Sequence, residues 1–126
     1  LGEIDQFVVI NSDIWTDYPI HKLPKTDLNA HIVLAPKSDS EKGDFDLEQG
    51  LVQTCSSPPF MFTGIASYKA SLFKGMVAEK KKLGPILRVW AKQKKLSGEI
   101  FPGKWFDIGT TEKLRNAERE LKKAKN

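Results

Sequence analysis

The sequence predicts an α/β fold in which helices pack against a mixed β-sheet. Two observations support this prediction: short aliphatic runs typical of strands recur along the chain, and one longer segment carries apolar residues at helical spacing. Strand-like and helix-like segments follow one another in mixed order along the 126 residues, which favours helices layered on a sheet. At this length we expect one domain with its own core.

Four segments are predicted to be extended. Gln6 to Asn11 (QFVVIN) holds four consecutive apolar residues, which indicates a strand buried on both faces with a neighbour on each side. Ala30 to Ala35 is rich in β-branched and aliphatic residues and is predicted to be a second strand. Phe45 to Val52 is predicted to be a hairpin with a glycine in its turn. Phe60 to Tyr68 is predicted to be a further strand, in which Gly64 marks a bulge or a close approach of backbones.

The clearest internal helix is predicted at Leu83 to Lys95, with Pro85 in the first turn, where its missing N–H costs little. Its apolar face is made by Leu83, Ile86, Leu87, Trp90 and Ala91. Lys69 to Met76 is expected to contain a short helical turn. Asp13 to Lys25 contains two prolines and is expected to be a loop with at most a short helix.

The last quarter of the chain is predicted to run from an extended segment into a helix. Ser97 to Phe106 is expected to be extended, with an interruption at a Pro-Gly pair. Thr110 or Thr111 is expected to cap the final helix, with Glu112 in its positively polarised first turn. The apolar stripe of this helix comprises Leu114, Ala117, Leu121 and Ala124.

Composition excludes several classes of protein. The formal net charge is +4, but the lysines lie in short clusters that are typical of solvated helix faces, and no aromatic pairs are interleaved with them. We therefore expect no nucleic-acid partner, although a basic nucleic-acid-binding domain is a distant alternative. No segment approaches the roughly 20 apolar residues of a membrane span, so no membrane association is expected.

The single cysteine and the two histidines give no sign of a disulfide or of zinc. Cys55 has no second cysteine to pair with, and a cytoplasmic location is the natural expectation for such a chain. His21 and His31 lack the spacing to Cys55 that a zinc site requires.

Two aspartates occupy positions suited to holding a metal. Asp13 directly follows the first predicted strand, and ligands of open α/β sheets bind beyond the carboxyl ends of strands. Asp107 lies between an extended aromatic segment and a helix start. Mg²⁺ takes one or two protein carboxylates and leaves its other positions to phosphate and water, so these two could share one ion. Each could equally be a turn or cap residue that braces its loop.

Three blocks carry a resemblance to a known family. They are VVINSDIW, FTGIASY and GEIFPGKWFDIGTTEKLRNAE, and they occur in the family's order. The chain resembles the carboxyl-terminal half of the sugar-1-phosphate nucleotidyltransferases, most of all the N-acetylmuramate-1-phosphate uridylyltransferases and mannose-1-phosphate guanylyltransferase-like proteins. The resemblance implies a partial Rossmann-like, three-layer (GT-A-like) nucleotidyltransferase fold with a mixed sheet, formed as one domain by residues 1–126.

The resemblance also implies roles for individual residues. In that family the aspartates of the first and last blocks bind the catalytic Mg²⁺, which implies Asp13 and Asp107. The glycine of the middle block lets the backbone approach the sugar, which implies Gly64. Glu99 lies where a substrate-facing acid is plausible, and Trp105 is expected to pack in the core.

The chain departs from the family pattern in three ways. The usual Asn-Gly-Asp is Asn11-Ser12-Asp13 here, so Asn11 and Ser12 are the implied substrate-side residues, and the serine adds bulk. The Glu-Lys-Pro motif of the thymidylyl branch is absent, which argues against that branch. The glycine-rich loop Gly-x-Gly-x-x-x-Arg and the Pro-Lys-Pro segment are also absent, so we expect the amino-terminal nucleotide-binding half to be missing.

The implied function is Mg²⁺-dependent nucleotidyl transfer from a nucleoside triphosphate to a sugar 1-phosphate, with release of pyrophosphate, as in nucleotide-sugar biosynthesis. We expect this chain alone to be weakly active or inactive. The alternative is a non-catalytic sugar-phosphate-binding or interaction module derived from the same fold. Because a free strand edge invites pairing, the expected partner is a second copy of the chain or a complementing amino-terminal half.

Overall fold

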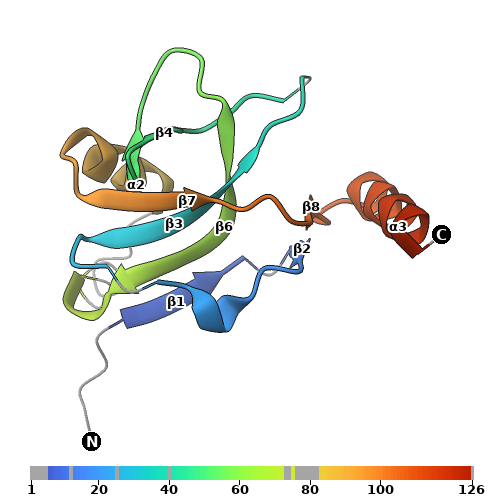
Figure 1. Cartoon of the computed structure of the whole chain (residues 1–126), viewed down its shortest axis with the longest axis horizontal. Coiled ribbons are helices and arrows are strands. Elements are labelled where there is room, and N and C mark those ends of the chain that lie inside the picture. Colours follow the sequence, from blue (N-terminus) through green and yellow to red (C-terminus); the bar gives the residue numbers. More distant parts are fainter. Residues whose placement is uncertain are drawn as a thin grey trace, which may run out of the picture.

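The main body of the protein is a six-stranded mixed sheet (Figure 1). A computed structural model describes residues 6–11, 13–24, 26–39, 41–72, 75 and 83–125. The strands of the sheet, in spatial order, are β1 (Gln6–Ile10), β6 (Phe60–Lys69), β3 (Ala30–Pro36), β7 (Leu96–Ile100), β5 (Leu51–Gln53) and β4 (Asp46–Glu48). Only the β3–β7 pair is parallel among these neighbours, so the predicted mixed sheet is confirmed.

A separate two-stranded ribbon and three helical segments complete the described fold. The ribbon pairs β2 (Ile14–Thr16) with β8 (Trp105–Asp107) in antiparallel fashion. The helical segments are the 3₁₀ turn η1 (Ile20–Lys22), α2 (Leu83–Lys92) and α3 (Thr111–Lys125). Residues 70–72 are also helical, and the rest of the turn predicted there lies mostly outside the described residues. None of the described helices has the length and apolar character that crossing a bilayer requires.

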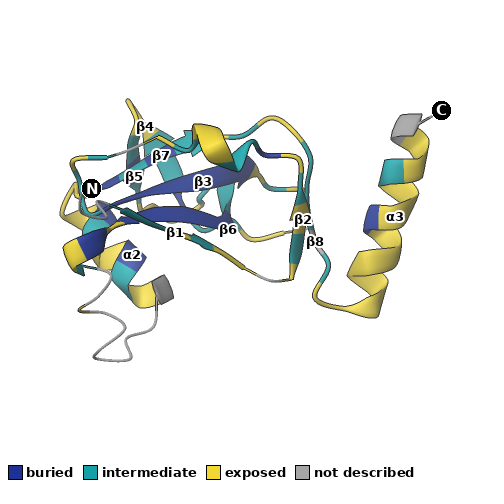
Figure 2. Ribbon diagram, turned by 90° about the horizontal axis from the view of Figure 1, so that it is seen from below, coloured by how far each residue is buried: buried dark blue, intermediate teal, exposed yellow. Residues whose placement is uncertain are grey.

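One face of the sheet is covered by α2. Leu87 and Ala91 of that helix are almost fully buried, as its apolar periodicity predicts, and they pack with Ile32, Leu34 and Tyr68 of the central strands. Figure 2 shows β3 and β6 as the most buried part of the sheet. Because both faces of these strands are covered, their sequences are nearly continuous apolar runs.

The opposite face of the sheet is covered by the segment that connects β2 to β3. Tyr18 of this segment is buried with Val33 and Ile65, and its ring meets Phe101 edge-on at a centroid distance of 5.0 Å. This second core holds the connection against the sheet, close to the ribbon.

The bulge predicted at Gly64 is present. The register of β3 with β6 passes from Ile32–Ala66 to Leu34–Phe62, so three residues of β6 lie opposite one residue of β3. Gly64 has φ of +89°, a conformation that residues with a side chain rarely adopt. The Thr63 hydroxyl beside it donates a hydrogen bond of 2.8 Å to the Val33 carbonyl.

Other local predictions are confirmed as well. The hairpin turns at Gln49 and Gly50, which both have positive φ, the pattern of the type I′ turn that suits hairpins. The N–H of Lys113 donates to the Thr110 hydroxyl at 3.1 Å, so Thr110 caps the final helix. The helix α2 ends at Lys92 rather than Lys95 because Lys94 adopts a left-handed conformation that closes it.

Two predictions about strands are wrong. β1 is not buried on both faces between two neighbours: it lies at the edge of the sheet, pairs only with β6 among the described strands, and leaves Val8 47% and Ile10 44% exposed. A run of apolar residues indicates a preference for extended backbone, but it does not determine whether the strand has one neighbour or two in the sheet. The predicted loop at residues 13–25 contains β2, a strand too short to show a periodic pattern.

Candidate functional site

The ribbon brings the two candidate metal-binding aspartates to the same place. Ile14 lies opposite Asp107 in the ladder, and the N–H of Ile108 donates to the carbonyl of Asp13 at 2.8 Å. The Asp13 backbone is thus hydrogen-bonded to the residue that follows Asp107, although the two segments lie at opposite ends of the sequence. β8 contains Asp107, Asp13 directly precedes β2, and each of the two strands is held in place by the other.

The donor set at this edge fits Mg²⁺ better than a metal enclosed by protein ligands. Asp13 is exposed and lies in a turn one residue before β2, where strand alternation does not dictate the side-chain direction. Asp107 is placed by its backbone in β8. The described residues contain no group of three or more His, Cys, Asp or Glu side chains that could hold a metal. Mg²⁺ sites take one or two carboxylates from the protein, whereas zinc sites need three or four protein ligands, so the number of candidate carboxylates is compatible with Mg²⁺.

Asn11 and Gly64, which the resemblance placed near the substrate, contact each other directly. The Asn11 N–H donates to the Gly64 carbonyl at 3.0 Å. A Cβ on Gly64 would lie 2.5 Å from the Asn11 amide nitrogen, so only glycine leaves room for that side chain. The bulge of β6 therefore fixes the end of β1, from which the chain leads to Asp13. Ser12 lies outside the described residues.

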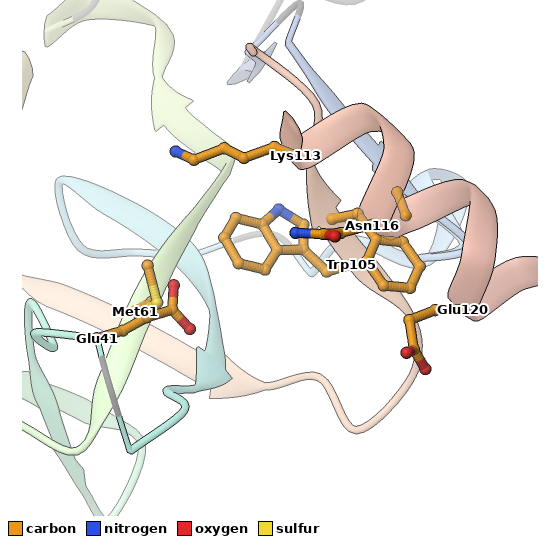
Figure 3. A pocket seen from close by; sticks show the side chains of 8 residues that line it. Glu41, Met61, Trp105, Lys113, Asn116 and Glu120 are labelled. Carbon is orange, nitrogen blue, oxygen red and sulfur yellow. The ribbon is translucent and has the colours of Figure 1, made fainter. Parts of the chain in front are cut away.

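Trp105 does not pack in the core as predicted. Its indole N–H donates to the Thr63 carbonyl at 2.8 Å, and its half-buried ring forms part of the wall of a cavity of about 300 Å³ between the sheet and α3. The cavity is lined by Glu41, Met61, Trp105, Phe106, Lys113, Asn116, Ala117 and Glu120. Figure 3 shows Lys113 and Asn116 of α3 beside Trp105, with Glu41 and Met61 across from them.

The helix α3 forms one side of this cavity and is otherwise mostly exposed. Figures 1 and 2 show it standing apart from the main sheet, beyond β8. Ala117 of its predicted apolar stripe is buried, whereas Leu114 is 41% exposed. The stripe is therefore only partly used for packing in the described structure.

Glu99 is engaged within the protein. Its Oε1 accepts hydrogen bonds from the Tyr18 hydroxyl at 2.5 Å and from His31 Nε2 at 3.2 Å, and about a third of its side chain remains exposed. Burial raises the pKa of Tyr18 above its ordinary value, and the hydrogen bond and charge of Glu99 raise it further. Tyr18 is therefore the protonated donor to a carboxylate acceptor.

The sequence did not identify Tyr18 and His31 as partners of Glu99, and it did not predict that the Trp105 ring lines a cavity. The pairing of Glu99 with His31 depends on β3 and β7 being parallel neighbours, with Val33 opposite Glu99. Neither strand carries a local signal of that pairing. Trp105 lies in the most distinctive motif of the chain, and its position two residues before Asp107 was the available signal.

Known proteins include a relative that shares sequence with this chain and a solved structure that shares its fold. No sequence profile of a protein family matches the chain. It is 30% identical over 127 residues to the N-acetylmuramate alpha-1-phosphate uridylyltransferase of Neisseria meningitidis serogroup B, in a match that covers 89% of this chain and 53% of that protein, at its carboxyl-terminal part.

A crystal structure from Bacillus anthracis, described as a glucose-1-phosphate thymidylyltransferase in complex with sucrose, superposes with a TM-score of 0.70. It is 20% identical, and the match covers 91% of this chain and 54% of that one, so it supports the fold. The chain spans about half the length of both proteins. The chain has a partial Rossmann-like α/β fold, and the sequence match and the shared fold both support the family that its three sequence blocks resemble, the sugar-1-phosphate nucleotidyltransferases.

Proposed function

We propose that this chain provides the metal-binding and acceptor side of an enzyme that transfers a nucleotidyl group from a nucleoside triphosphate to a sugar 1-phosphate. The observation that carries the proposal is the β2–β8 ladder, which joins the backbone segments of Asp13 and Asp107 in a chain similar to proteins of this family. Two carboxylates on neighbouring backbone segments suit an ion that must also bind phosphate.

The proposed reaction is an in-line displacement at phosphorus. An oxygen of the sugar 1-phosphate forms a bond to the α-phosphorus, the bond from that phosphorus to the oxygen bridging to the β-phosphate breaks, and pyrophosphate leaves. Mg²⁺ bound at the site would offset the negative charge of the reacting phosphates. Asp13 and Asp107 would hold the ion, and the fixed contact of Asn11 with Gly64 would keep the Asp13 segment in position.

The cavity beside Trp105 supports the assignment of the acceptor side. An aromatic ring fixed by its own N–H, with Asn116 and Lys113 beside it, offers stacking and hydrogen bonds to a sugar, in a cavity whose lining also includes the carboxylates of Glu41 and Glu120. Trp105 and Phe106 directly precede Asp107 in β8, so the same strand serves both the cavity and the metal edge. The sugar is the component of the substrate that this cavity would contact.

The proposal also assigns the binding of a partner to the edge strand β1. β1 is the terminal strand of the described sheet, with Val8 and Ile10 exposed, and edge strands pair readily with other strands. The relatives are about twice as long as the matched region. We therefore propose that this chain alone turns over weakly or not at all, and that a complementing amino-terminal half or a second copy seats at this edge.

The test is release of pyrophosphate from UTP in the presence of Mg²⁺ and N-acetylmuramate 1-phosphate, with and without the amino-terminal half of the meningococcal relative. We expect release to appear or rise strongly when that half is added. Asp13→Ala and Asp107→Ala should abolish it. Asp39→Ala, which removes an exposed aspartate elsewhere, should not.

The outcomes separate the parts of the proposal. Full turnover by the chain alone would refute the need for a partner and leave the transferase assignment standing. Release that persists in both site variants would refute the assigned metal edge. Binding of the sugar phosphate without any turnover, under every condition, would favour a non-catalytic binding module instead.

A further inference from the structure

A row of polar side chains crosses the sheet face on which Tyr18 packs. Glu99 Oε1 accepts from the Tyr18 hydroxyl and from His31 Nε2, His31 Nδ1 lies 2.9 Å from the Ser97 hydroxyl, and that hydroxyl lies 3.1 Å from the hydroxyl of Thr26. Five residues from three parts of the chain are thus joined by four consecutive hydrogen bonds.

The protons of this row can be placed without conflict. A carboxylate only accepts, so His31 Nε2 carries the proton shared with Glu99. In the neutral ring Nδ1 is then an acceptor. The Ser97 hydroxyl accepts from Thr26, and its one hydrogen faces two acceptors, His31 Nδ1 at 2.9 Å and the Ala30 carbonyl at 3.3 Å, of which the shorter contact is to His31. Every bond has one donor and one acceptor, which is the condition for a buried polar network to stabilise a fold.

The row binds both ends of the connection between β2 and β3. Tyr18 is the second residue of that connection and Thr26 lies near its end. Among the described strands β2 pairs with β8 alone and is not part of the main sheet, so the place of the ribbon depends on ties of this kind. The other ties include the Trp105 indole to Thr63 and the Phe101 N–H to the Leu34 carbonyl.

We propose that Glu99 is a positioning residue, which through Tyr18 holds the β2–β8 ribbon, and with it the backbones of Asp13 and Asp107, at a fixed place against the main sheet. The bond from Tyr18 has a charged acceptor, and such bonds are stronger than those between neutral groups. The part of the inference that concerns the metal rests on the proposed function, whereas the positioning of the ribbon does not.

This role differs from a substrate contact for Glu99. Its Oε1 already takes two internal donors, and about two thirds of its side chain is covered. A substrate contact would make Glu99 important while leaving the Tyr18 hydroxyl dispensable. A positioning role predicts that removing either the Tyr18 hydroxyl or the Glu99 carboxylate loosens the ribbon, because each change breaks the bond between them.

The experiment compares Tyr18→Phe, Glu99→Gln and Glu99→Ala with Tyr68→Phe in the full chain. Tyr18→Phe keeps the buried ring and removes only the hydroxyl. Tyr68→Phe makes the same chemical change in the other core, away from the ribbon, and is the matched control. The first readout is amide hydrogen exchange by NMR at Ile108 and Asp17, whose N–H groups bond across the ribbon.

We expect Tyr18→Phe and Glu99→Ala to speed exchange at Ile108 and Asp17 about tenfold, the factor that corresponds to about 1.4 kcal/mol of local stability. Glu99→Gln should have a smaller effect because a neutral amide oxygen can still accept from Tyr18. Exchange within β3 should stay unchanged in all three variants. Unchanged exchange at the ribbon, or equal acceleration by Tyr68→Phe, would overturn the proposal.

The second readout is binding of Mn²⁺, a paramagnetic substitute for Mg²⁺, followed by electron paramagnetic resonance. We expect Tyr18→Phe to weaken Mn²⁺ binding roughly three- to tenfold, a smaller loss than direct partners of metal ligands cause, with Tyr68→Phe unchanged. Wild-type binding that is insensitive to Asp13→Ala would defeat the metal site of the proposed function, and the exchange data would still decide the positioning role. Loss of sugar-phosphate binding in Glu99→Gln but not in Tyr18→Phe would overturn that role in favour of a substrate contact.

Discussion

Replacing Gly64 by alanine tests how the bulge of β6 and the end of β1 depend on each other. Gly64 has φ of +89°, and a new Cβ would lie 2.5 Å from the Asn11 amide nitrogen and 2.8 Å from Asn11 Cγ. A positive φ costs a residue with a side chain about 1–2 kcal/mol. Pushing a packed neighbour aside adds about 1–2 kcal/mol. We therefore expect Gly64→Ala to lower the free energy of unfolding by about 2–4 kcal/mol.

Gly50 provides a matched control for the backbone term. It has a similar φ of +80°, and a Cβ added there meets nothing within 4 Å. Gly50→Ala should therefore carry the conformational cost alone, about 1 kcal/mol. Asn11→Ala in the Gly64→Ala background removes the two closest clashing atoms and should recover about half of the lost stability.

Thermal unfolding followed by circular dichroism gives the measurement. One kcal/mol corresponds to about 4 °C for a domain of this size, so we expect losses of about 8–16 °C for Gly64→Ala and about 4 °C for Gly50→Ala. Equal losses in the two variants would refute the steric argument. An unchanged melting temperature on adding Asn11→Ala would refute the assignment of the clash to that side chain.

Three further predictions concern stability. Lys94→Gly should raise the free energy of unfolding by about 0.5–1 kcal/mol in urea titrations, because Lys94 holds φ of +60° at the end of α2, where glycine is favoured. Thr110→Ala should lower the helical circular dichroism of α3 and cost about 1 kcal/mol, because it removes the cap of that helix. Burial raises the pKa of Tyr68 to about 12, so the folded chain keeps a proton that the unfolded chain loses above pH 10. Stability should thus fall between pH 10 and 12, and Tyr68→Phe should reduce that fall, whereas an equal fall in the variant would contradict the assignment.

Features that depend on short stretches of sequence could be predicted. The glycine within an apolar run marked the bulge at Gly64, the Glu-Gln-Gly triplet marked the hairpin turn, and helical spacing marked α2. Each of these signals acts within a few residues, where local backbone preference dominates. The two aspartates were identified from their position after a strand and before a helix, and then from the family resemblance.

Features that depend on pairing between distant strands could not be predicted. β2 and β8 have three residues each and no periodicity, and they become strands only because each meets the other. The hydrogen bond between His31 and Glu99 follows from the parallel register of β3 with β7, and neither strand contains a residue that predicts this register. The exposed position of β1 likewise depends on which strand lies beside it.

The separation of the ribbon from the main sheet has a consequence for the order of folding. All six strands of the sheet lie within residues 6–100, whereas the ribbon must join residues 14–16 to residues 105–107. Closing so long a loop costs more chain entropy than any other strand pairing described here, so the sheet can gain its hydrophobic contacts before the ribbon does. During synthesis the two aspartates would therefore come together late, after the strands of the sheet have paired. A protease that cuts between β7 and β8 would separate the two aspartates and leave every strand of the sheet in place.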